Sequence, residues 1–121
     1  MKTWPEVVVL DSPSSWEVFK AKPGEKVLFK FSPRCPVSFA AEDEYRSWLE
    51  GLPEAPAFWI ARIDVVAQRE LTRAIAAEVG VRHESPQALW FGADGKVRWH
   101  ASHEGVNADS LSATAPRVPS P

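Results

Sequence analysis

Short apolar runs alternate with longer amphipathic segments along this chain, and this alternation limits the folds that it can adopt. The runs at 26–31, 58–65 and 87–91 have the length and the aromatic and β-branched content of buried strands. The segments 36–50 and 68–79 repeat their apolar residues at helical spacing instead. A strand–helix–strand unit makes its two strands parallel through a right-handed crossover. We therefore expect an α/β domain built around a parallel pair of strands.

The last third of the chain predicts an antiparallel extension of this sheet. Gly92–Gly95 has the residues of a tight turn, so that 97–101 can pair with 87–91 as a hairpin. Asn107 is placed to cap a last helix that ends near residue 113. The resulting order of strand, helix, strand, helix, hairpin and helix predicts a thioredoxin-like fold. We expect a four-stranded mixed sheet with helices on both faces.

The same fold predicts which loops meet. In a thioredoxin-like sheet the strand 87–91 lies antiparallel beside 26–31, so that the start of one strand adjoins the end of the other. Ser85-Pro86, just before the later strand, is therefore expected next to Cys35, which follows the earlier one.

Local signals predict how the first three helices are capped or exposed. Ser14-x-x-Glu17 fits a capping box for a short first helix that ends near 23–24. The acidic run 42–44 in the second helix predicts a face in contact with water. Gly80 is placed to cap the third helix at its C-terminus.

Length and charge restrict the class of protein. With 121 residues, 45% of them hydrophobic, the chain predicts one soluble domain at 1–114, followed by a disordered tail at 115–121 that contains proline and serine. The net charge of −2 and the dispersed lysines and arginines argue against binding to nucleic acid. No segment approaches the roughly 20 apolar residues of a membrane span, and the apolar stretch 7–10 is too short for a signal peptide. We expect a cytoplasmic protein.

Cys35 is the only cysteine, and its position suggests reactivity. It stands between a predicted strand end and a helix that Pro36 would begin, since proline is favoured at the first helical position. The positive end of a helix dipole and unpaired backbone N–H groups favour the thiolate, and the neighbouring Arg34 adds positive charge. A single cysteine excludes an intramolecular disulfide and a cysteine-based zinc site, so no metal is expected. The alternative is a buried, inert thiol.

Ser38 stands where the second sulfur of a Cys-x-x-Cys motif would be. Three residues after Cys35 on a helix, its hydroxyl could donate a hydrogen bond to the thiolate. It could equally be an ordinary surface residue of the first turn. Either way, Cys35 has no internal thiol to resolve a mixed disulfide.

Cys35-Pro36-Val37-Ser38, followed by His83-Glu84-Ser85-Pro86-Gln87 and then by Ser102-His103, resembles the monothiol bacilliredoxins, a thioredoxin-fold family associated with the low-molecular-weight thiol bacillithiol. The resemblance extends from Val27 to Leu111. It departs from the family at Arg34, where a small polar residue is common, and at Glu104, where an aromatic residue is usual.

The resemblance implies two features of the site, and the positions of the residues suggest the other roles. Cys35 would be the nucleophile, and the bond before Pro86 would be cis. Around the thiolate we expect supporting roles for Arg34, Pro36 and Ser38. On the facing loop we expect Ser85 and Pro86 to bind substrate. His83 could also act there by poising the thiol, or could simply hold its loop by hydrogen bonding; His100 is expected to be structural or exposed, and the role of His103 stays open.

The implied activity is that of a monothiol thiol–disulfide oxidoreductase. The Cys35 thiolate would remove a small thiol from a mixed disulfide on a client protein, with bacillithiol as the co-substrate and no bound cofactor. The alternative is a non-catalytic binding module or stress-associated adaptor with the same fold, because a fold by itself does not imply catalysis.

Overall fold

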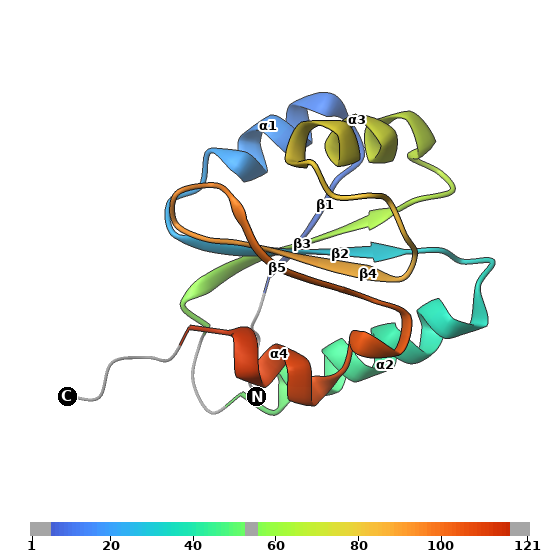
Figure 1. Cartoon of the computed structure of the whole chain (residues 1–121), viewed down its shortest axis with the longest axis vertical. Coiled ribbons are helices and arrows are strands. Elements are labelled where there is room, and N and C mark those ends of the chain that lie inside the picture. Colours follow the sequence, from blue (N-terminus) through green and yellow to red (C-terminus); the bar gives the residue numbers. More distant parts are fainter. Residues whose placement is uncertain (1–5, 53–55, 117–121) are drawn as a thin grey trace.

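The computed structural model describes residues 6–52 and 56–116. They form a mixed β-sheet between two layers of helices, as in a thioredoxin-like fold (Figure 1). The elements in chain order are β1 (Val7–Val9), α1 (Pro13–Lys20), β2 (Glu25–Phe31), α2 (Pro36–Glu50), β3 (Phe58–Asp64), α3 (Arg69–Val79), β4 (Gln87–Phe91), β5 (Val97–Ser102), a 3₁₀ turn (His103–Gly105) and α4 (Ala108–Thr114).

The strand order β1-β3-β2-β4-β5 places β2 at the centre of the sheet. β2 pairs in parallel with β3 and antiparallel with β4, in the register Lys30↔Gln87 to Lys26↔Phe91. The predicted hairpin is formed by β4 and β5, with a register irregularity after Trp90. The antiparallel pairing predicted from the sequence is therefore confirmed, and the end of β2 lies beside the start of β4.

The expectation of four strands was wrong, because β1 adds a fifth. Val7–Val9 pairs in parallel with Ile60–Arg62 of β3 at the edge of the sheet. Three residues are too few to show an alternating pattern, and their place is decided by the neighbouring strand rather than by their own sequence. An edge strand this short also limits how much unpaired backbone the sheet exposes.

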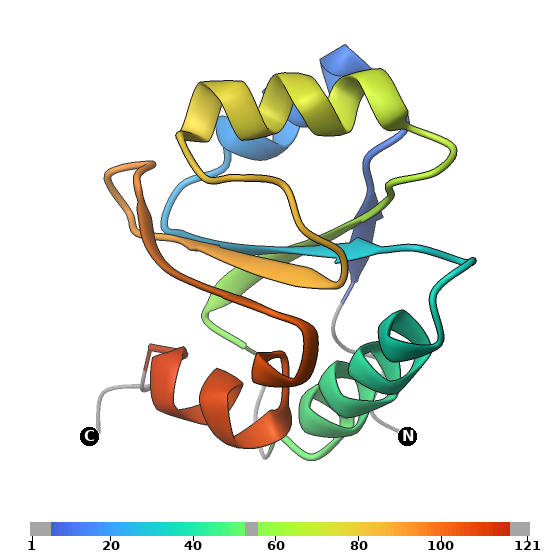
Figure 2. The same ribbon diagram turned by 45° about the vertical axis from the view of Figure 1, so that its right-hand side comes forward.

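The helices cover both faces of the sheet (Figure 2). α1 and α3 pack on one face through Trp16, Phe19, Leu71 and Ile75. α2 and α4 pack on the other, where Phe29 of β2 stacks on Tyr45 of α2 with 4.1 Å between ring centroids. None of the described helices has the length and apolar content needed to cross a membrane.

Two of the predicted helix caps are confirmed, whereas both ends of α1 were misplaced, since it ends at Lys20 and not near 23–24. Gly80 caps α3 in the left-handed conformation, with φ 73°, and Asn107 caps α4. α1, however, is capped by Ser12, whose hydroxyl accepts a hydrogen bond from the Ser15 N–H and which forms a capping box with Ser15. Serine can replace glutamate in this motif because its hydroxyl reaches the backbone N–H of the cap residue. Of the predicted tail, 117–121 lies outside the described residues.

The acidic run of α2 does not wholly face water. Glu42 is buried and forms ion pairs with Arg46 at 3.0 Å and with Arg62 of β3 at 3.2 Å. Burial, and then the Glu42 charge, raise the pKa of the neighbouring Tyr45. The prediction that Glu42 is solvated was wrong because an arginine from another element neutralises it.

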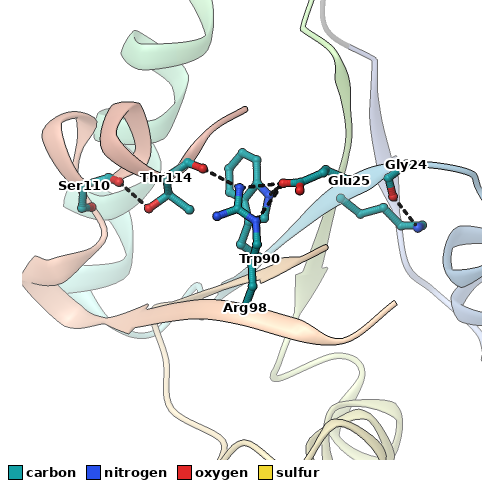
Figure 3. A network of polar contacts seen from close by, with 7 residues as sticks. Gly24, Glu25, Trp90, Arg98, Ser110 and Thr114 are labelled. Atoms are coloured by element: carbon teal, nitrogen blue, oxygen red, sulfur yellow. Dashed lines mark hydrogen bonds and ion pairs between the residues drawn. The ribbon is translucent and has the colours of Figure 1, made fainter. Parts of the chain in front are cut away.

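Glu25 connects three elements at the start of β2 (Figure 3). Its Oε1 accepts hydrogen bonds from Trp90 Nε1 of β4 at 2.6 Å and from Arg98 Nη2 of β5 at 2.6 Å. The same guanidinium donates to the carbonyl oxygen of Thr114 at the end of α4. One carboxylate thus satisfies the N–H of a fully buried tryptophan and ties the hairpin to the last helix.

Replacement of Glu25 by alanine should lower the free energy of unfolding by about 1–3 kcal/mol, because it leaves the buried Trp90 N–H without an acceptor. Glu25→Gln should cost less, since the amide oxygen still accepts from Trp90. Glu17→Ala is the matched control: Glu17 pairs with Lys20 at the surface, and its loss should cost less than about 1 kcal/mol. Urea unfolding measures all three. Equal losses for Glu25→Ala and Glu17→Ala would contradict the role of this network.

Candidate functional site

The thiol of Cys35 lies at the N-terminus of α2. Cys35 is the cap residue, in an extended conformation (φ −114°, ψ 117°), and Pro36 is the first residue of the helix. The Cys35 N–H donates to the Ser32 carbonyl at 3.2 Å, and its own carbonyl accepts from the Ser38 N–H at 3.0 Å. No side chain caps this helix, and the cysteine is partly exposed. A sulfur here is open to reactants and lies at the positive end of a 15-residue helix.

Ser38 joins the loop before Cys35 to the loop before β4. It is 1% exposed, so it is not the surface residue that one interpretation offered. Its hydroxyl accepts the Ser32 N–H at 3.2 Å and lies 3.5 Å from the Ser85 hydroxyl. Across the described residues, no hydrogen bond reaches the Cys35 sulfur. In this state Ser38 therefore holds the two loops together rather than contacting the thiol.

Ser85-Pro86 lies on the loop that faces Cys35. The peptide bond between these residues is cis, as the family resemblance implied. Pro86 is buried, and its carbonyl accepts a hydrogen bond from the His103 N–H at 2.9 Å. The contact between Ser85 and Ser38 places this loop against the first turn of α2. The α3–β4 loop and the β2–α2 loop lie at the same end of the sheet in both views (Figures 1 and 2).

His103 and His100 take different places at the end of the hairpin. His103, with φ 55°, holds Pro86 through its backbone, while its exposed Nδ1 lies 4.0 Å from Glu84 Oε2. The other oxygen of Glu84 accepts from the Ser102 hydroxyl at 3.0 Å. His100 is exposed on β5, in agreement with the sequence interpretation. The Glu84 carboxylate is thus directed toward the end of β5.

Lys30 is a site residue that the sequence interpretation missed. It lies on β2, is 2% exposed, and places its Nζ 3.3 Å from Nδ1 of His83 on the α3–β4 loop. Burial lowers the pKa of Lys30 to about 8. Burial and the positive charge of Lys30 lower the pKa of His83, against a smaller opposing effect of Glu84. The available signal was a lysine between Phe29 and Phe31, in a strand whose first half carries a second buried lysine, Lys26.

The surface around the thiol combines positive charge with apolar side chains. Arg34 is exposed directly before Cys35, and its backbone N–H donates to the Ser32 hydroxyl at 3.3 Å. Phe39, four residues further along α2, is half exposed and packs edge-to-face on Phe31 at 5.4 Å. Within the part of the chain that the structure describes, no three His, Cys, Asp or Glu side chains gather where they could hold a metal ion. The arrangement suits exchange reactions at sulfur.

Comparisons with known proteins agree with this geometry. A family model described as "Monothiol bacilliredoxin BrxC" matches residues 8–111. A solved structure described as "A putative oxidoreductase with a thioredoxin fold" is 28% identical, with a TM-score of 0.76 over 88% of this chain and 91% of that chain. The thioredoxin of Malassezia sympodialis is 17% identical, with a TM-score of 0.68 over 93% of this chain and 90% of that one. Oxidised thioredoxin from Plasmodium falciparum is 13% identical, with a TM-score of 0.66 over 89% and 93%. The two thioredoxins show the fold alone.

The buried Lys30 makes stability depend on pH in a defined direction. Its folded-state pKa is lowered from 10.5 to about 8, so the unfolded chain binds more protons between these values. Stability should therefore rise with pH across this window, by roughly 3 kcal/mol if the whole shift is expressed. In Lys30→Met this contribution should be absent, whereas that of Lys26, whose pKa burial also lowers, remains in both proteins.

The measurement is urea unfolding of both proteins from pH 7.5 to 10.5. At pH 7.5 Lys30→Met should be the more stable protein, because methionine keeps the length of the side chain without an uncompensated charge. The difference between the two proteins should shrink as the pH rises, and Tyr45, present in both, cancels in the comparison. A difference that stays constant over this range would show that Lys30 does not titrate there.

Proposed function

This chain belongs to the monothiol bacilliredoxin family, and we propose that it is a monothiol thiol–disulfide oxidoreductase that removes bacillithiol from mixed disulfides on client proteins through Cys35. The observation that carries the proposal is the setting of this one sulfur. It is partly exposed at the start of α2, beside the loop of Ser85 and Pro86. Where a dithiol enzyme would have its second sulfur, Ser38 is buried.

The proposed reaction has two exchanges. The Cys35 thiolate attacks the sulfur of the small thiol in the mixed disulfide, the client leaves as a thiolate, and Cys35 takes over the disulfide bond to the small thiol. A second small thiolate then attacks the sulfur of the bound small thiol. This forms the small-molecule disulfide and regenerates the Cys35 thiolate. A separate reductase must return that disulfide to the thiol, because this chain has no second cysteine.

The residues around Cys35 have supporting roles in this proposal. Pro36 and the first turn of α2 direct backbone dipoles at the sulfur, and Arg34 adds a positive charge beside it. Ser38 fixes the spacing between this turn and the facing loop. Ser85 and Pro86 would form one wall of the site, where an extended client segment could pair with the Ser85 backbone. The proposed setting is the cytoplasm, where thiols stay reduced.

The other candidate is an adaptor that binds partners without turnover. The half-exposed Phe39 beside Cys35 would serve either function, since it offers an apolar contact to a bound protein. The two candidates differ in whether the sulfur of Cys35 exchanges with that of a small thiol.

Mixing the reduced protein with a client that carries bacillithiol should transfer one bacillithiol per protein molecule to Cys35 and stop there. Turnover beyond one equivalent should begin only when free bacillithiol and a reductase for its disulfide are added. Mass spectrometry of both proteins over time measures the transfer, and Cys35→Ser should abolish both phases. If the client stays modified while Cys35 remains open to alkylation, the adaptor is the correct function.

Ser38→Cys should change how the adduct is resolved. A thiol at this position lies one helical turn from Cys35 and can attack its disulfide, so that bacillithiol leaves and an intramolecular disulfide forms. Intact mass should then show release of the small thiol with none added. Ser38→Ala is the matched control, because it removes the same hydroxyl without supplying a sulfur, and it should keep the adduct. An adduct equally stable in both variants would contradict the proposed place of residue 38.

A further inference from the structure

Lys30 is a buried cation, and no carboxylate among residues 6–52 and 56–116 pairs with it. It points from the centre of the sheet to the α3–β4 loop, and its cross-strand neighbour in β4 is the neutral Gln87. Across the described residues, the one side chain bonded to its Nζ is His83. Burial of an ammonium group without a counter-ion is costly. A position that retains such a charge at the edge of a reactive site suggests a role outside stability.

The contact with Lys30 fixes the protonation of His83. An ammonium group donates hydrogen bonds and cannot accept them, so Nδ1 of His83 must be the acceptor. The ring proton is then on Nε2, and the ring is neutral. His83 is itself exposed. At pH 7, below the Lys30 pKa of about 8, the pair therefore presents one N–H donor with a positive charge behind it.

This donor lies on the loop that faces Cys35. His83 precedes Ser85 by two residues, and Ser85 contacts Ser38 in the first turn after Cys35. Gln87 holds the same loop by donating from Nε2 to the Arg82 carbonyl at 3.0 Å. The loop is thus fixed on both sides of His83, by α2 and by β4.

The charges around this loop favour an anion. Arg82 is exposed beside His83, and Arg34 is exposed beside Cys35. The nearest carboxylate in sequence is Glu84, and its two oxygens are turned toward Ser102 and His103 at the end of β5. Glu84 still acts on His83, but the positive charge of Lys30 has the larger effect there.

We propose that His83 binds a carboxylate of the small thiol while the sulfur of that small thiol exchanges with Cys35. Lys30 holds the neutral His83 ring in place and supplies the positive charge behind it. The ligand class is a low-molecular-weight thiol that carries a carboxylate. The Nε2–H of His83 donates to the carboxylate, and Lys30 is a positioning residue that sets the tautomer and supplies the charge. This inference rests on the proposed exchange at Cys35 and adds a recognition site to it.

The test uses one neutral client peptide in two mixed disulfides, with 3-mercaptopropionate and with its neutral isostere 3-mercaptopropionamide. The leaving peptide is the same in both compounds, and so is the carbon chain attached to the sulfur that Cys35 attacks. The ratio of the two rates therefore measures recognition of the carboxylate. At pH 7 the wild-type protein should react about tenfold faster with the carboxylate compound. Lys30→Met and His83→Leu should each reduce the ratio to about one.

Lys96→Met is the matched control, because it removes one lysine charge from the turn at the far end of β4 and should keep the ratio. His83→Gln should restore part of it, since its amide supplies an N–H donor. A third peptide, with an aspartate beside the cysteine and the amide small thiol, separates a carboxylate on the small thiol from one on the client. A rate gain with this peptide that Lys30→Met removes would assign the site to the client and overturn the proposal.

Nitrogen NMR of His83 provides a readout that does not depend on exchange. The wild-type ring should carry its proton on Nε2, and the pKa of His83 should rise in Lys30→Met but not in Lys96→Met. A proton on Nδ1 in the wild-type protein, or equal rate ratios in all variants, would overturn the carboxylate site while leaving exchange at Cys35 intact. Lack of reaction with either disulfide would instead contradict the proposed function itself.

Discussion

β2 pairs with β4 in antiparallel fashion at the centre of the sheet, and the site depends on this pairing. It places the residues that follow β2 next to the residues that precede β4, although more than forty positions separate them in sequence. Cys35 and Pro86 meet at the same edge for this reason. The packing of α2 on the sheet then holds Cys35 at this edge, because Tyr45 of α2 stacks on Phe29 of β2.

Ser38 shows how a monothiol site can keep the geometry of a dithiol site. In this position a second cysteine would attack the disulfide of Cys35. The hydroxyl of Ser38 instead joins two loops, because it accepts a hydrogen bond from the Ser32 N–H and contacts the Ser85 hydroxyl. The internal resolving chemistry is absent while the spacing of the loops is kept. In the proposed function the small thiol takes over the missing step, and this makes its recognition part of the mechanism.

Three charged groups in or against the sheet are explained by contacts between elements. Glu25 satisfies Trp90 and Arg98, and Glu42 is neutralised by Arg46 and Arg62. These two carboxylates have cationic partners and serve the packing of the sheet. Lys30 differs from them, because its partner is a neutral imidazole beside the thiol site. Because Lys30 has no oppositely charged partner among the described residues and lies beside the thiol site, we interpret it as functional rather than structural.

The sequence by itself determined the order of the elements from α1 to β5, the bounds of α2 and β4, and the place of Cys35 at a helix start, because periodicity and proline and glycine signals act over a few neighbouring residues. The cis bond before Pro86 followed from family resemblance and is present. The tertiary structure alone decided the rest. β1 is a strand because it pairs with the edge of β3. Glu42 is buried because Arg62 of β3 forms an ion pair with it. Lys30 contacts His83 because two segments that are distant in sequence lie at the same end of the sheet. Each of these depends on a partner far away in the chain, and no local pattern records which partner the fold will supply.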